Sequence, residues 1–213
     1  MAWKKHVLLW LIALLLGALL VPALSSSADI MRRVLREITL IEAVLGKKET
    51  AEITQSASAI YRSLFLETGL VESSKKALVS KEEQRSSEAV FGGSVTKMSD
   101  ITNDYILGLS ALCFASLVRI MIFGAWMPYM LPFFIAAIAD GMARRQIKMV
   151  SFGYVSPVLY SLALHSMITI IFLPMLYLIV PIPLSPILIP FWALIAAIPV
   201  MAMISNTQRL AGD

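Results

Sequence analysis

The sequence predicts an all-α integral membrane protein with four transmembrane helices and a helical periplasmic segment between the first and the second. The chain has 213 residues, of which 58% are hydrophobic, whereas a typical soluble domain has about 45–50%. The hydrophobic residues are also gathered into long runs with almost no charge. About 20 apolar helical residues cross a hydrocarbon core of about 30 Å, so each run is a candidate membrane span.

The first apolar run covers residues 7–24 and follows Lys4 and Lys5. It is longer than the core of 7–15 residues that a secretory signal peptide usually has. Small residues at 26–28 would suit a cleavage site. Because of the length of the run, we expect residues 1–24 to form an uncleaved signal anchor.

Residues 25–104 form the outer segment, which holds eleven Lys/Arg and twelve Asp/Glu and is therefore nearly neutral. The helical spacing of apolar side chains predicts a first helix that ends before Gly46 and a second helix over 50–68. The positions are Met31, Val34, Leu35, Ile38, Ile41 and Leu45, then Ile53, Ala57, Ile60 and Leu64. The polar stretch 73–99 indicates a weak helix followed by a flexible link. A segment this short makes a small core, so we expect its helices to pack on partner subunits or on the membrane-proximal helix.

The second apolar run covers residues 105–139, and its only charge is Arg119. A straight helix of that length would reach about 52 Å, which is too long for one crossing. It is either one long helix that begins outside the membrane or a helix broken near Gly124 and Pro128. If the crossing is 120–139, Arg119 lies at the outer interface and its side chain snorkels toward water, and we favour this alternative. If the crossing starts at Tyr105, Arg119 lies deep in the membrane and must be paired with another group.

The last two runs are predicted to form a helical hairpin over residues 157–204. Ser156 suits the cap of the third span, and Pro157 suits its first turn. The prolines in the stretch 181–186 remove backbone donors, which indicates a tight uncharged turn before the fourth span. Residues 205–213 would then form a short tail.

A basic segment follows the second span and sets the predicted orientation. Its charged and special residues are Asp140, Gly141, Arg144, Arg145 and Lys148. Cytoplasmic loops carry an excess of Lys and Arg, so we expect residues 140–156 to be a cytoplasmic loop and both termini to be cytoplasmic. Asp140 and Gly141 would end the helix at the interface. The cations either serve this topology alone or also dock a cytoplasmic partner.

Motifs of known enzymes and metal sites are missing from the sequence. There is no phosphate-binding G-x-x-x-x-G-K-[ST] loop and no H-E-x-x-H motif, and no metal or cofactor site can be recognised. Cys113, the single cysteine, is interpreted as a small apolar residue. His165 is expected to be neutral and bonded to a neighbouring helix, with a proton relay as the alternative. We therefore expect no enzyme activity.

The C-terminal half resembles a family of inner-membrane proteins from conjugative plasmids and integrating conjugative elements. The matching stretches are "IADGMARRQIK" at 138–148, "FGYVSPVLYSLALH" at 152–165 and "LIVPIPLSPILIP" at 178–190. This resemblance implies an accessory role in conjugative DNA transfer, within a type IV secretion apparatus. It also implies other transfer membrane proteins as neighbours, among them the membrane-bound coupling ATPase.

Two functions follow as hypotheses. The first is a non-enzymatic scaffold in the bacterial inner membrane that contacts lipids and transfer proteins, without direct binding of nucleic acid. The alternative is a small transporter or ion-conducting subunit that uses Arg119 and His165. A transporter usually has several paired polar groups at the midplane, and this chain has at most two. The sequence leaves homo-oligomerisation open.

Overall fold

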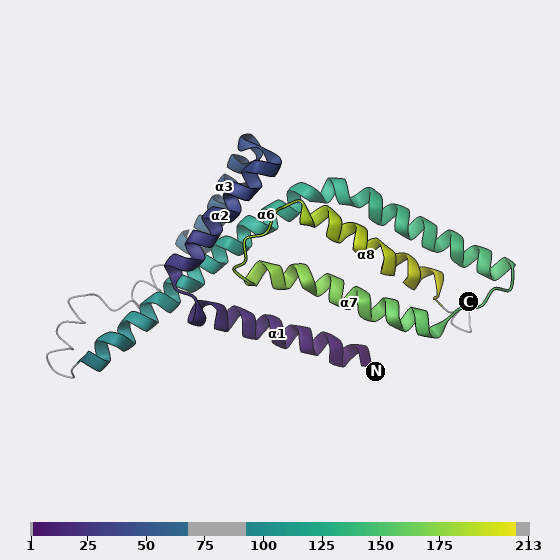
Figure 1. Cartoon of the computed structure of the whole chain (residues 1–213), viewed down its shortest axis with the longest axis horizontal. Helices are drawn as coiled ribbons and strands as arrows, with labels where there is room; N and C mark the ends of the chain where they lie inside the picture. The colour runs from purple at the N-terminus through teal and green to yellow at the C-terminus, as the bar shows by residue number, and fades with distance from the viewer. Residues whose placement is uncertain (1, 68–92, 208–213) are drawn as a thin grey trace. The chain divides into compact units, whose positions relative to one another are not determined.

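The computed structural model describes residues 2–67 and 93–207, and within them it is helical without strands (Figure 1). The elements are α1 (Ala2–Leu24), α2 (Ser27–Leu45), α3 (Lys47–Tyr61), the π-helix η1 (Arg62–Glu67), α6 (Gly93–Val150), α7 (Pro157–Ile179) and α8 (Leu188–Ser205). Within these described residues, four helices are long and apolar enough to span a membrane, namely α1, α6, α7 and α8. The predicted all-α membrane protein with four such helices is confirmed.

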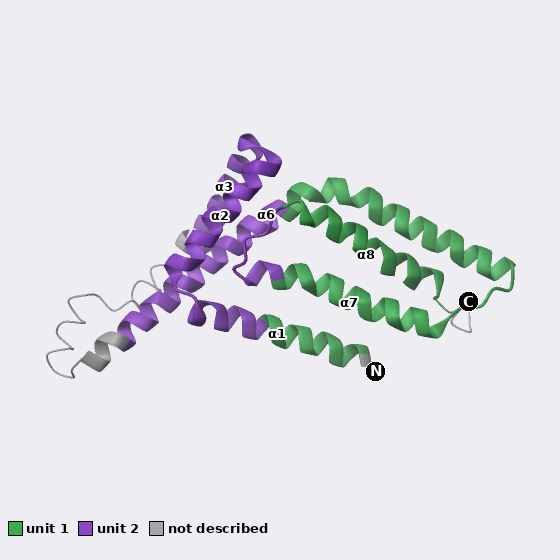
Figure 2. Cartoon of the chain, viewed as in Figure 1, with its two compact units in different colours: residues 1–14, 123–176, 186–213 green, residues 15–122, 177–185 purple. Residues whose placement is uncertain are grey.

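The chain divides into two compact units, coloured in Figure 2. Unit 1 comprises residues 1–14, 123–176 and 186–213, and unit 2 comprises residues 15–122 and 177–185. The division falls inside α6, between Ile122 and Phe123. Each unit therefore contains part of the longest helix and has its own packed side chains.

Unit 2 contains the α2–α3 pair, which packs beside the first half of α6 (Figure 2). Ser26 caps α2 by accepting a hydrogen bond from the Asp29 N–H at 3.2 Å. Gly46 separates the two helices with a φ of 86°, a conformation that glycine adopts without steric cost. The expected helix end at Gly46 is thus confirmed. Buried apolar side chains of this unit are Ile30, Val34, Ile41, Ile53, Ala57, Ala111, Leu112, Ala115, Val118 and Ile122.

The second outer helix is less regular than its sequence pattern predicts. The α-helix ends at Tyr61, and residues 62–67 continue as the π-helix η1. A π-helix adds a residue to each turn and rotates the following side chains away from the α-helical face. For this reason Leu64 is 49% exposed, although it was expected on the same face as Ile53 and Ala57. The weak helix expected from residue 73 lies outside the described residues. The expectation of a flexible link after it is wrong from Gly93 onward, because α6 begins at that residue.

The helix α6 is continuous from Gly93 to Val150, so of the two predicted shapes the structure has the long helix. Pro128 and Pro132 lie inside it. The expectation that Asp140 and Gly141 end this helix is wrong, and residues 140–150 are helical rather than a loop. An ion pair of 2.8 Å between Asp140 and Arg144, one turn apart, supports the helix at this point.

Unit 1 contains most of the α7–α8 hairpin and the second half of α6. Ser156 caps α7 through a bond from the Leu159 N–H to its Oγ at 3.2 Å, as expected from the sequence. The indole N–H of Trp192 in α8 donates to the Ile170 carbonyl of α7 at 2.9 Å. The Phe123 ring of α6 packs edge-on against Trp192, with ring centroids 6.0 Å apart. Thus α6, α7 and α8 are held together within this unit.

Candidate functional site

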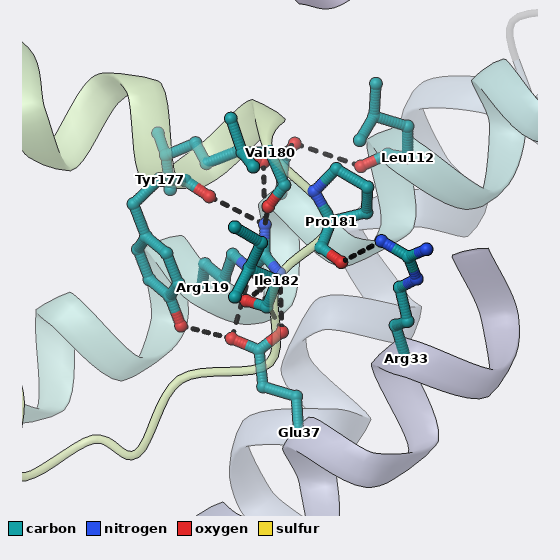
Figure 3. Close-up of polar contacts among 10 residues, drawn as sticks. Arg33, Glu37, Leu112, Arg119, Tyr177, Val180, Pro181 and Ile182 are labelled. Atoms are coloured by element: carbon teal, nitrogen blue, oxygen red, sulfur yellow. Dashed lines mark hydrogen bonds and ion pairs between the residues drawn. The ribbon is translucent and has the colours of Figure 1, made fainter. Parts of the chain in front are cut away.

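The most elaborate polar site in unit 2 surrounds Arg119 of α6 (Figure 3). Arg119 and Glu37 of α2 are 1% and 2% exposed, and Arg119 Nη2 lies 2.7 Å from Glu37 Oε2. Arg119 Nε lies 3.0 Å from each oxygen of the same carboxylate. The Tyr177 hydroxyl donates to Glu37 Oε1, and the Tyr177 ring lies 4.5 Å from the guanidinium carbon.

The remaining donors of Arg119 bind backbone carbonyls at the end of α7 and in the turn after it. Nη1 donates to the carbonyls of Tyr177 at 2.6 Å and Val180 at 2.8 Å, and Nη2 donates to that of Ile182 at 3.3 Å. The last carbonyls of a helix have no partner within the helix. Arg119 therefore closes the C-terminal end of α7, where a cation is also favoured by the helix dipole.

The helix α2 is held over this site by further polar contacts at its start. The Ser27 N–H and hydroxyl both donate to Asp104 Oδ1 of α6, at 3.0 and 2.6 Å. Arg33 Nη1 donates to the Pro181 carbonyl at 3.1 Å (Figure 3). The outer helix is thus joined to α6 and to the turn after α7 by side chains along its length. We call Arg119, Glu37, Tyr177 and the bound carbonyls the Arg119 cluster.

The Arg119 cluster is saturated. A guanidinium has five N–H donors, and each nitrogen of Arg119 has acceptors at 2.6–3.3 Å. The favoured expectation that Arg119 snorkels is wrong, because a snorkelling side chain keeps its charged end in water. An arginine buried with an ion-pair partner acts as a fixed structural link, and it has no free donor for a substrate.

The second polar site, in unit 1, joins α1 and α7 through two histidines. His6 Nδ1 lies 3.0 Å from His165 Nδ1, and the Trp10 indole N–H donates to His6 Nε2 at 3.1 Å. Since Nε2 of His6 is the acceptor, a neutral His6 carries its proton on Nδ1 and donates to His165. His165 Nδ1 is then the acceptor, so this contact is one that two neutral histidines can form. Among the described residues, no group of three metal-ligating side chains accompanies them.

The basic segment at the end of α6 is only partly free. Lys148 Nζ donates to Asn206 Oδ1 at 2.9 Å and to the Ser205 carbonyl at 3.3 Å, at the end of α8. Arg144 is exposed and pairs with Asp140. Arg145 makes no ion pair with a described residue. Lys148 therefore has an internal role. Arg145 is half-buried with its Nε enclosed in the protein, so Arg144 is the more exposed of the two arginines.

Gly141 of the basic segment permits a close approach of α6 and α8. A Cβ atom at this position would lie 3.0 Å from Ile204 Cβ and 3.1 Å from the Met201 carbonyl oxygen. Contacts this short force a neighbour to move, and one of these neighbours is backbone. The glycine thus serves helix packing and not helix termination.

Sequence reasoning missed the partners of these polar residues. Glu37 occupies a buried position on α2 in register with Ile30, Val34 and Ile41. A lone carboxylate within an apolar stripe is a signal that it has a buried partner. Tyr177, His6 and Asn206 gave no comparable signal, because each is compatible with an isolated polar contact.

A comparison with protein families finds a match that covers most of the chain. The model of the DtrJ-like family, described as IncC plasmid conjugative DNA transfer protein DtrJ-like, matches residues 21–210. The chain belongs to the DtrJ-like family. It is thus a conjugative DNA transfer protein with several apolar helices suited to a membrane. The resemblance to conjugative plasmid proteins is confirmed. Neither the curated proteins nor the solved structures gave a match.

The matched range contains the whole Arg119 cluster and the basic segment. His6 and Trp10 precede it, so the family match covers only the His165 side of the histidine pair.

Proposed function

We propose that this DtrJ-like protein is a non-enzymatic scaffold of the conjugative DNA transfer apparatus in the bacterial inner membrane. In this role it holds an outer helical segment on one side of the membrane and presents a basic surface on the other. The observation that carries the proposal is the saturated Arg119 cluster, which fixes α2 to α6 and to the turn after α7. A rigid link between an extramembrane segment and the spans suits a scaffold.

The distribution of cations supports the proposed orientation. Lys4 and Lys5 precede the first span, and Arg144 and Arg145 lie at the end of α6, so both ends are expected in the cytoplasm. Three arginines also follow the first span on the proposed periplasmic side. Two of them have partners there: Arg32 pairs with Asp29 at 2.5 Å and Arg33 binds the Pro181 carbonyl.

The proposed partner on the cytoplasmic side is the coupling ATPase that delivers DNA to the transfer channel. Arg144 and Arg145 would bind acidic groups of this partner through charge-assisted hydrogen bonds, which are about twice as strong as neutral ones. The role requires neither direct contact with DNA nor a cofactor. The described spans support the alternative of a transporter less than they support a scaffold, because every nitrogen of Arg119 already has acceptors within the protein.

A dose experiment tests the proposal. A donor strain that lacks the gene is complemented from an inducible promoter, and transfer frequency is measured against the amount of the protein in the membrane. A scaffold binds its partners stoichiometrically, so transfer should rise roughly in proportion to the protein until its partners are saturated. Full transfer at about one hundredth of the native amount would contradict a scaffold and favour a turnover function. Normal transfer from the deletion strain would refute any role in transfer.

A further inference from the structure

A cleft separates the ends of α6 and α8 in unit 1. Its volume is about 360 Å³, within the range of about 300–1,000 Å³ that is usual for small-molecule sites. One part of its lining is apolar and the other is polar, from Ile147, Met201 and Ala202 and from Arg144, Lys148 and Asn206. A ligand that matches this lining has a polar head joined to an apolar part.

The cleft lies where the hydrocarbon core of the membrane ends. The 18 residues of α8 span about 27 Å, close to the core thickness of about 30 Å. Lys148 Nζ contacts the carbonyl of Ser205, the last residue of α8. Residues 123–139 of α6 and all of α8 are without charge, so the segment 140–148 carries the first charges at this edge. The cleft is therefore at the level of the phospholipid headgroups.

The charge of Lys148 is not cancelled by an acid of unit 1. Asp140 is the only Asp or Glu among the described residues of this unit, and it pairs with Arg144 at 2.8 Å. Lys148 instead binds uncharged acceptors, namely Asn206 Oδ1 at 2.9 Å and the Ser205 carbonyl at 3.3 Å. An ammonium group has three donors, so these two bonds leave one donor and the whole positive charge for a ligand.

Arg145 adds a second positive charge close to the cleft. It follows Gly141 by one helical turn and precedes Lys148 by another, on the face of α6 that packs against α8. Its Nε is enclosed and has no acceptor among the described residues, and it makes no ion pair with them. Two cations without a carboxylate of their own favour an anion at this level of the membrane.

We infer that the cleft between α6 and α8 binds an anionic phospholipid. Its phosphate accepts the free donor of Lys148 and supplies the acid that unit 1 lacks, while its glycerol and upper acyl chain cover Ile147 and Met201. Ile147 is 65% exposed in the protein alone, and a lipid chain removes this apolar surface from water. Basic pockets between transmembrane helices bind anionic headgroups in this way. The inference concerns a lipid and is independent of the proposed protein partner.

The first experiment measures lipid preference. The full-length protein is placed in nanodiscs with equal amounts of phosphatidylglycerol and phosphatidylcholine, and native mass spectrometry identifies the lipids that stay bound to it. We expect phosphatidylglycerol to be retained in preference to phosphatidylcholine, because only the former carries a net negative charge. Equal retention of the two lipids would overturn the inference.

Lys148→Gln tests the cation. A lysine near the membrane surface contributes about 1 kcal/mol, so the ratio of bound phosphatidylglycerol to phosphatidylcholine should fall about fivefold. Lys5→Gln is the matched control, since it removes an exposed cation of unit 1 that does not line the cleft. This control should keep the wild-type ratio. An equal fall in both variants would show a general attraction to charge and would contradict a specific site.

Ala202→Phe tests the cleft without a change of charge, because Lys148→Gln also alters the bonds to the end of α8. The new ring fills the cleft, and we expect the preference for phosphatidylglycerol to be lost while the unfolding temperature in detergent is unchanged. If this variant is unstable, Ile147→Ser replaces it, since it removes the apolar wall at an exposed position. Wild-type lipid preference in the stable variant would refute the assignment of the cleft.

Inorganic phosphate in the nanodisc buffer distinguishes a lipid from a soluble anion. We expect millimolar phosphate to leave the bound phosphatidylglycerol in place, because phosphate has no apolar part to cover Ile147 and Met201. Release of the lipid by phosphate would make the cleft a site for a soluble anion, and the lipid would be the wrong occupant.

Discussion

Arg119 and Glu37 are 82 residues apart in sequence, and their side chains form a buried ion pair of 2.7 Å. The pair joins a span-forming helix to the amphipathic helix α2. It gives the outer segment a fixed attachment that its small apolar core does not provide by itself.

The destabilising effects of mutations at Glu37 and Arg119 should be strongly non-additive. Glu37→Leu or Arg119→Leu alone leaves a buried charge without its partner, which we expect to destabilise the protein by about 3–5 kcal/mol. The double variant Glu37→Leu/Arg119→Leu should be less destabilised than the sum of the single changes. The midpoint of thermal unfolding in detergent measures all three. Strict additivity would show that the two side chains do not interact.

Arg119→Lys should resemble a loss of the cluster more than a conservative change. Lysine retains the charge but has three donors on one nitrogen, so it cannot bind the Glu37 carboxylate and the carbonyls of Tyr177 and Val180 together. We expect lower abundance in the membrane, measured by quantitative immunoblot. Wild-type abundance would mean that charge alone holds the cluster.

Two glycines of α6 should respond in opposite ways to alanine. At Gly141 the new Cβ would lie 3.0 Å from Ile204 Cβ, whereas at Gly124 nothing lies within 4 Å. Gly141→Ala should therefore lower the unfolding temperature. Gly124→Ala should be neutral or stabilise the helix by up to about 1 kcal/mol. Equal effects of the two changes would exclude the close α6–α8 contact.

The orientation of the chain can be tested with single cysteines in a Cys113→Ser background. Ser56 in α3 and Ser151 after α6 are both exposed. An impermeant thiol reagent on whole cells should label position 56, if it reaches the periplasm, and should label position 151 only after lysis. Labelling of position 151 but not of 56 in intact cells would reverse the proposed topology.

The sequence predicted the helices well because hydrophobic length and helical spacing are local properties. The run 157–180 and the turn at 181–186 correspond closely to α7 and the turn after it. The wrong prediction of a helix end at Asp140 and Gly141 has one cause in tertiary packing and one within the helix. Asp140 and Gly141 resemble a helix end, but the contact of Gly141 with α8 and the Asp140–Arg144 pair extend the helix to Val150.

The candidate sites were harder to predict than the spans. Arg119 and His165 stood out as polar residues in apolar runs, but their environments depend on contacts across the fold. Arg119 needed a carboxylate from α2, and the sequence gives no pairing between segments so far apart. His6 and His165 are 159 residues apart in sequence, and only the structure brings their Nδ1 atoms to 3.0 Å.

The most direct test of the scaffold asks whether a variant that keeps only one of the two proposed binding surfaces interferes with the wild-type protein. Arg144→Gln/Arg145→Gln should retain the Arg119 cluster and the outer segment but lose the charges proposed to bind the cytoplasmic partner. Overproduced in a donor that also carries the wild-type gene, this variant should occupy sites on the outer side and lower transfer. The variant is checked for normal insertion and topology, and overproduced wild-type protein is the control. The account predicts a clear fall in transfer frequency for the variant alone. Unchanged transfer, with the variant inserted in excess of the wild-type protein, would contradict a scaffold that joins partners on both sides of the membrane.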